Sequence, residues 1–147
     1  MEERLKELIS SYQVSHSLPR QFYTSEALYK IDIEHYWNHS WIWVGHINQI
    51  PNVGDFFLFD YGYESVIVAR DKNKDVNALL NVCRHRGSRV CLEKSGNTRV
   101  FACPYHAWTY ELNGNLRGAR EMGDSFDKAE HSLKKVNLRI FQGLIFV

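Results

Sequence analysis

Two short segments of the sequence carry residues that can bind a metal. The first offers Cys83 and His85, and the second offers Cys103 and His106. Each segment lies where a predicted strand ends, so each is expected to form a loop at the tip of a strand. Thiolates and imidazoles are common metal ligands, and two such loops facing each other would form a site with four ligands.

Two kinds of metal centre use two sulfur and two nitrogen ligands. One is a tetrahedral Zn²⁺ ion, which would be structural and have no redox role. The other is a Rieske [2Fe–2S] centre, in which two histidines replace two cysteines on one iron and raise the reduction potential. The spacing of the ligands alone leaves both possibilities open.

The residues around the two segments resemble a known family. The stretches NVCRHRG at 81–87 and CPYHAWTY at 103–110 resemble the ligand loops of Rieske ring-hydroxylating-type oxygenase α subunits. The similarity covers almost the whole chain, from SLPRQFYT at 17–24 to GLIFV at 143–147. The chain therefore resembles the N-terminal Rieske portion of such a subunit.

This resemblance implies a cofactor and the residues that hold it. By analogy with the family, the cofactor is a Rieske [2Fe–2S] cluster. Cys83 and Cys103 would hold one of its irons, and His85 and His106 would hold the other. A non-haem Fe(II) is expected only in a catalytic domain that this sequence does not include, and no catalytic residue is assigned here.

Further residues near the two motifs are predicted to influence the cluster. The hydroxyl groups of Ser88 and Tyr105 are candidates to donate hydrogen bonds to its sulfurs, which would tune the potential. Trp108 is expected either to cover one side of the cluster and limit access of solvent, or to be an ordinary tryptophan of the core. The third cysteine, Cys91, belongs to neither ligand pair and is interpreted as a small buried residue near the cluster rather than as a redox-active one.

Charge and composition narrow the class of protein. The chain has 147 residues, about one domain, with 18 Lys and Arg against 17 Asp and Glu. This balance argues against a nucleic-acid-binding protein, which normally has a concentrated basic excess. Arg84, Arg86 and Arg89 gather near the first motif, where they either attract an acidic electron donor or are solvated or locally paired. No signal peptide and no membrane-spanning stretch is recognised, so a cytoplasmic protein without membrane or nucleic-acid partners is expected.

The pattern of elements predicts a mainly β fold. We expect a Rieske-type antiparallel β-sandwich at 41–147, with a small cluster-binding subdomain at about 82–116. An N-terminal extension at 1–40 is predicted to contain one or two helices. The predicted helices lie at 1–10 and 25–38, and the predicted strands at 41–47, 56–59, 65–69, 76–82, 98–102, 108–112, 115–117, 136–141 and 144–147. Turns are predicted at 95–97 and at Asn113-Gly114, a strong hairpin signal.

The resemblance also implies a function. The chain is expected to be the electron-transfer portion of an oxygenase α subunit. It would take electrons from a reductase or ferredoxin and pass them to a non-haem Fe(II) that hydroxylates a small substrate. The full-length protein is expected to be a homotrimer, whereas this portion alone is expected to transfer electrons without hydroxylating.

The substrate and the alternatives rest on finer similarities. The two loops look most like those of the branch that acts on quaternary ammonium compounds. An aromatic-ring-hydroxylating dioxygenase α-subunit portion is the alternative within the family. A stand-alone Rieske ferredoxin and a zinc-stabilised binding module are alternatives of other classes, and the N-terminal extension favours the oxygenase over the ferredoxin.

Overall fold

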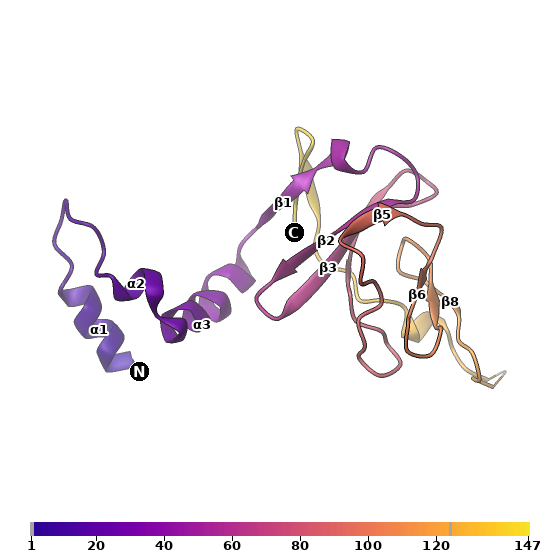
Figure 1. Ribbon diagram of the computed structural model, residues 1–147, viewed down its shortest axis with the longest axis horizontal. Helices are drawn as coiled ribbons and strands as arrows, with labels where there is room; N and C mark the ends of the chain where they lie inside the picture. Colours follow the sequence, from indigo (N-terminus) through magenta and orange to yellow (C-terminus); the bar gives the residue numbers. More distant parts are fainter. Residues whose placement is uncertain (1, 124) are drawn as a thin grey trace. The chain divides into compact units, whose positions relative to one another are not determined.

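The computed structural model describes residues 2–123 and 125–147, which form two compact units. One unit runs to Trp41 and the other begins at Ile42 (Figure 1). No helix in the described part of the chain has the length and apolar character needed to cross a membrane.

The first unit is helical. Ser25 caps its longest helix, because its Oγ accepts a hydrogen bond from the backbone N–H of Leu28 at 3.4 Å. The helix predicted at 25–38 is shorter than expected, since α-helical bonding ends at His35 and a separate 3₁₀ turn follows. The helical elements are α1 (Glu2–Ser10), α2 (Gln21–Thr24), α3 (Glu26–His35) and η1 (Trp37–His39).

The described residues of the second unit form three antiparallel sheets, which confirms the prediction of a mainly β fold. The central sheet has four strands in the order β4-β3-β2-β5, and two three-stranded sheets have the orders β1-β10-β9 and β6-β7-β8. Two further 3₁₀ turns are η2 (Ile47–Gln49) and η3 (Ala129–His131). The strands are β1 (Trp43–His46), β2 (Asp55–Tyr61), β3 (Glu64–Arg70), β4 (Val76–Leu80), β5 (Ser95–Asn97), β6 (Phe101–Ala102), β7 (Thr109–Tyr110), β8 (Leu116–Gly118), β9 (Arg139–Phe141) and β10 (Leu144–Phe146).

The central sheet is covered on both faces. Successive residues of a strand point to opposite faces, and in β3 the residues from Ser65 to Ala69 are all buried. Val66 and Val68 pack with Ile145 of β10 on one face. Ile67 lies on the other face, in a core cluster that also contains both candidate ligand cysteines and Trp108. The candidate ligand loops are therefore built against a sheet whose other face packs on Ile145 of strand β10.

The segment SGN at 95–97 was predicted as a turn, and this prediction is wrong. Ser95–Asn97 forms the edge strand β5, which pairs with β2 through its backbone while its own side chains stay exposed. Gly96 lies opposite Phe56, and a Cβ at this position would come within 3.2 Å of the Phe56 ring. The glycine that suggested a turn instead makes room for a core aromatic ring in the neighbouring strand.

The hairpin predicted at Asn113-Gly114 is present and connects β7 to β8. Gly114 has a φ of 92°, in the region that favours glycine. A Cβ on this residue would lie only 2.8 Å from Cδ2 of Leu79 in the core. Its carbonyl also accepts a hydrogen bond from the N–H of Leu133 at 2.8 Å. The turn is thus packed into the central sheet rather than projecting into solvent.

We expect Gly114→Ala to destabilise the protein by about 1–3 kcal/mol, because it combines an unfavourable φ with a clash in the core. The measurement is the midpoint of thermal unfolding of the intact protein, followed by circular dichroism. Gly118→Ala is the control, since the nearest heavy atom to a Cβ there, Cβ of Thr109, is 3.9 Å away. Equal midpoints for the two variants would contradict this reading of the turn.

Candidate metal centre

The first candidate loop runs from Cys83 to Ser88 and follows strand β4. The backbone N–H of Cys83 donates to the carbonyl of Ser88 at 2.8 Å, and the N–H of Gly87 donates to the carbonyl of Cys83 at 3.0 Å. Gly87 has a φ of 74°, which lets the chain reverse direction within the loop. His85 lies between these two hydrogen bonds, at the tip.

The second candidate loop has the same construction. It runs from Cys103 to Trp108 between strands β6 and β7. The N–H of Cys103 donates to the carbonyl of Trp108 at 2.8 Å, and the N–H of Ala107 donates to the carbonyl of Cys103 at 2.9 Å. Ala107 also has a positive φ, of 57°, although it is not a glycine. Two segments far apart in the sequence therefore form equivalent loops, each with a cysteine at its root and a histidine near its tip.

The four candidate ligands lie together in the structure. Cys83 and Cys103 are each only 3% exposed and belong to the same core cluster. The rings of His85 and His106 are adjacent, with centroids 4.7 Å apart. The structure thus brings both predicted pairs to one place, with the sulfurs in the interior and the imidazoles half-buried.

The polar atoms at this place fit a metal–sulfur group. Nδ1 of His85 is buried and has no hydrogen-bond partner among the described residues, and the same is true of Nε1 of Trp108. Such atoms are costly to bury unless something satisfies them. An iron accepts a nitrogen lone pair, and a cluster sulfide accepts an N–H. Trp108 belongs to the same buried cluster as the two cysteines and stacks on His85, so a metal–sulfur group held there could satisfy both atoms.

The ligands also occur as pairs. Within residues 2–123 and 125–147, no three His, Cys, Asp or Glu side chains converge closely enough to hold one metal ion. A two-iron cluster needs only two protein ligands on each iron, so this arrangement is compatible with it.

A comparison with known families decides between the kinds of centre. The family model for the Rieske [2Fe–2S] domain matches residues 40–137. The chain belongs to the Rieske [2Fe–2S] domain family.

Relatives of this Rieske chain include oxygenases. The glycine betaine monooxygenase oxygenase subunit of Pseudomonas aeruginosa is 39% identical over 142 residues, which cover 96% of this chain and 33% of that protein. Naphthalene 1,2-dioxygenase from Rhodococcus sp., in a crystal structure with indole bound, has a TM-score of 0.87 and 31% identity over 98% of this chain and 34% of its own. A quaternary ammonium Rieske monooxygenase in complex with γ-butyrobetaine has a TM-score of 0.81 and 32% identity over 96% of this chain and 41% of its own. The chain spans about a third of the length of the curated relatives it matches.

The surroundings of His85 favour its neutral imidazole form. Burial, together with the nearby charges of His106 and Arg86, lowers the pKa of His85. Neutral imidazole is the form that binds metals. Burial raises the pKa of the Cys83 thiol, and a hydrogen bond with Tyr110 acts in the opposite direction.

Tyr110 is a residue of the site that the sequence analysis missed. Its hydroxyl oxygen is 3.2 Å from Sγ of Cys83 and accepts a hydrogen bond from the N–H of Arg84 at 3.0 Å. With that N–H already donating to the oxygen, the hydroxyl proton is free to point at the sulfur. Tyr110 is fully buried, and burial together with the hydrogen bond to Cys83 raises its pKa, so it stays a donor. The alternation of strand β7 was the available signal, since it places Tyr110 on the same side as the buried Trp108.

Trp108 packs directly on a candidate ligand. Its ring is parallel to that of His85, with an interplanar angle of 8° and centroids 4.7 Å apart. Phe126 and His131 lie against other parts of the indole, with centroids 5.4 Å and 5.9 Å away. Trp108 is 2% exposed. The indole and its aromatic neighbours therefore fix the ring of His85 and shield its inner side from water.

The remaining predicted residues lie further out. Ser88 donates its hydroxyl proton to the carbonyl of Arg89 at 3.3 Å, so in this structure the hydroxyl is used within the loop. Tyr105 is 59% exposed, with its ring against His106 at a centroid distance of 3.9 Å. Arg86 is exposed and borders a cavity of about 700 Å³ next to both histidines. These residues form the outer side of the site.

We expect Tyr110→Phe to lower the midpoint potential of the cluster by about 40 mV. The reduced cluster carries the extra negative charge, and a hydrogen bond to a cysteine sulfur stabilises that state more than the oxidised one. A difference of about 1 kcal/mol between the two states corresponds to that shift for one electron. The measurement is a redox titration monitored by electron paramagnetic resonance (EPR). Tyr105→Phe is the matched control, because its exposed hydroxyl has no contact with a cysteine sulfur in the structure. A potential for Tyr110→Phe equal to that of the wild type would refute the role of this hydroxyl.

Proposed function

We propose that this chain is the Rieske electron-transfer portion of a cytoplasmic oxygenase α subunit. In this proposal Cys83 and Cys103 bind one iron of the cluster, and His85 and His106 bind the other. The single observation that carries the proposal is the pair of equivalent loops, which bring two buried cysteines and two adjacent histidines together around an unpaired buried nitrogen. The family to which the chain belongs and the oxygenase subunits among its relatives support it.

The residues around the site have different roles in this proposal. When bound, a Rieske cluster accepts and releases one electron at a time at a higher potential than an all-cysteine cluster. Trp108 and the core cluster around the cysteines keep water from the inner side. On the outer side, His85 and His106 border the open cavity, so the imidazoles are the shortest route between the interior and a redox partner.

Each of the four ligands should be required for the cluster. We expect Cys83→Ser, Cys103→Ser, His85→Ala and His106→Ala each to abolish most of the bound iron and acid-labile sulfide. Cys91→Ser and His39→Ala are the matched controls, since they remove the same side-chain types outside the two loops. The measurement is iron and sulfide content together with the EPR spectrum of the reduced protein. Purification without oxygen of a colourless wild type with stoichiometric zinc would refute the proposal.

An electron donor is proposed to dock beside the histidines. Of Arg84, Arg86 and Arg89, only Arg89 has an ion-pair partner among the described residues, with Nη1 3.3 Å from Oδ1 of Asp60. Arg84 and Arg86 are exposed, which supports docking of an acidic face of a reductase or ferredoxin there. The rate of reduction by such a donor should then fall as ionic strength rises, and a rate independent of salt would count against it.

Assembly of the full-length protein into a homotrimer is part of the same proposal and is tested by its mass in solution.

The substrate is proposed to be a quaternary ammonium compound. The support is the relative named glycine betaine monooxygenase, at 39% identity over 96% of this chain. Similarity to naphthalene 1,2-dioxygenase, with a TM-score of 0.87, supports an aromatic hydrocarbon as the alternative. The substrate pocket is expected outside the Rieske portion, so resemblance in this portion bears on the choice only indirectly.

A direct assay separates these substrates. The coding sequence is first read past Val147, where an in-frame continuation with two histidines and a carboxylate is expected. The resulting protein, supplied with a reductase, NADH and O₂, should consume glycine betaine and leave naphthalene unchanged. Consumption of naphthalene alone would support the aromatic alternative. A stop codon and electron transfer without O₂ consumption would instead indicate a stand-alone Rieske ferredoxin.

A further inference from the structure

The two ligand loops are closed at their roots in different ways. The second loop is the tip of a β-hairpin, in which Ala102 pairs with Thr109 and Phe101 pairs with Tyr110. The first loop has no such support. In the part of the chain that the structure describes, β4 ends at Leu80, and the next strand, β5, pairs with β2 instead. The ends of the first loop must be joined by something other than strand pairing.

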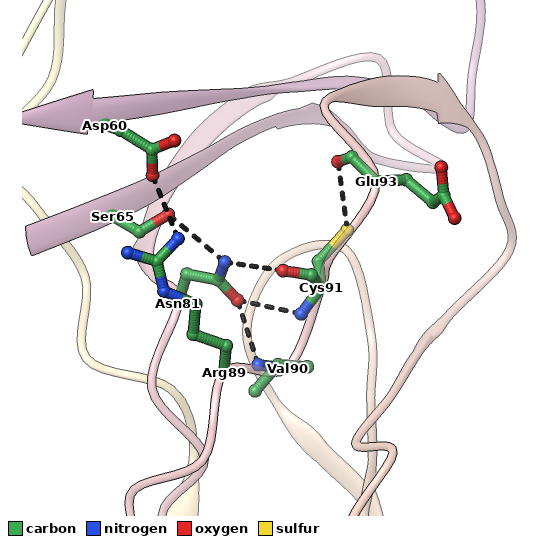
Figure 2. A network of polar contacts seen from close by, with 7 residues as sticks. All are labelled: Asp60, Ser65, Asn81, Arg89, Val90, Cys91 and Glu93. Atoms are coloured by element: carbon green, nitrogen blue, oxygen red, sulfur yellow. Dashed lines mark hydrogen bonds and ion pairs between the residues drawn. The ribbon is translucent and has the colours of Figure 1, made fainter.

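Asn81 makes this connection with its side chain. Its Oδ1 accepts hydrogen bonds from the N–H groups of Val90 at 3.0 Å and Cys91 at 2.8 Å. Its Nδ2 donates to the carbonyl of Cys91 at 2.7 Å and to Oγ of Ser65 at 3.2 Å. Figure 2 shows the amide between these groups, where it bonds both the backbone N–H and the backbone carbonyl of Cys91. All four hydrogen-bonding positions of the amide are used, and the side chain is fully buried.

These contacts join the chain segment before the first loop to the segment after it. Asn81 lies two residues before Cys83, whereas Val90 lies two residues after Ser88, the last residue of the loop. The backbone N–H of Asn81 also donates to the carbonyl of Ser65 in β3 at 2.8 Å. One residue therefore fixes both ends of the first loop to each other and to the central sheet.

We propose that Asn81 is the positioning residue of the first ligand loop, the residue that fixes where Cys83 and His85 lie relative to the second loop. This inference rests on the proposed binding of a Rieske cluster by the two loops. The side-chain hydrogen bonds of Asn81 go to Ser65, Val90 and Cys91 and to none of the four candidate ligands, so its effect on the cluster is transmitted through the backbone of the loop. The amide replaces the ladder of hydrogen bonds that the hairpin supplies to the second loop.

A second side-chain contact, on the segment that follows the first loop, provides a comparison. The ion pair between Arg89 and Asp60 also ties the chain after the loop to the central sheet, as Figure 2 shows. Both side chains are at least half exposed, and exposed ion pairs contribute little. Arg89→Ala is therefore the matched control, because it removes an ion pair of the segment after the first loop and should leave the cluster unchanged.

Substitutions at the amide separate positioning from general stability. Asn81→Asp keeps the shape of the side chain but loses both donors and places a carboxylate oxygen against the carbonyl of Cys91. Ser65→Ala removes only one of the four side-chain contacts and is the milder change. The test uses protein labelled with ¹⁵N-histidine and reduced to its paramagnetic state. Pulsed EPR then resolves the coupling of each ligand nitrogen to the cluster.

We expect Asn81→Asp to change one of the two histidine couplings, that of His85, and to leave the other at its wild-type value. Release of iron to a chelator should be about tenfold faster, as expected for the loss of buried hydrogen bonds. Ser65→Ala should change the same coupling by a smaller amount, and Arg89→Ala should change neither. If Asn81→Asp cannot retain a cluster, the coupling in Ser65→Ala decides.

The outcomes distinguish this inference from the proposed function. Two unchanged couplings in both variants would overturn the role of Asn81, and so would equal changes in both couplings, which would indicate general loosening of the domain. A wild-type protein without two histidine nitrogen couplings would refute the proposed cluster itself, whatever the variants show.

Discussion

The central constraint on this protein is that two separate loops must hold the candidate ligands in a fixed relation without a covalent link between them. Cys83 and Cys103 sit in the interior, and Nδ1 of His85 is buried without a partner in the described chain. Groups of this kind are tolerated only when a bound group satisfies them and the surrounding backbone stays rigid. Each loop meets this need with the same two backbone hydrogen bonds, so its shape is set locally and does not depend on the other loop.

Rigid loops still have to be placed against each other, and this is the role of the central sheet. Ile67 of β3 and Leu79 of β4 belong to the same buried cluster as the two cysteines and Trp108. The opposite face of the sheet packs on Ile145 of β10, which anchors the strands from behind. Because protein interiors are close-packed and hard to compress, a sheet packed on both faces moves little and holds the loops that end its strands in place. The arrangement explains why a short domain can present a preformed site.

The sequence allowed prediction of the features that depend on neighbouring residues. The ligand motifs, the hairpin at Gly114 and most strands follow from local patterns, and the structure contains them. The short strand at Ser95–Asn97 was missed because its residues resemble a turn and it forms only through pairing with β2. Tyr110 was missed for a similar reason. Its contact with Cys83 joins residues that are 27 positions apart in the sequence, and the alternation of strand β7 indicates only which side Tyr110 takes, not which residue it meets.

The contrast between the two loops shows how equal local shapes can rest on unequal supports. A β-hairpin distributes the closure of the second loop over several backbone hydrogen bonds, and side-chain changes along it leave those bonds intact. The first loop depends on the side-chain amide of Asn81, whose four hydrogen bonds are all made inside the protein. Loss of any one of these bonds would leave a buried polar group without a partner. The second loop should therefore tolerate side-chain substitutions in its support, whereas the first loop should be sensitive to substitution of Asn81. In the proposed assignment each iron takes one protein ligand from each loop, so a displacement of the first loop moves Cys83 at one iron and His85 at the other, while the ligands from the second loop stay in place.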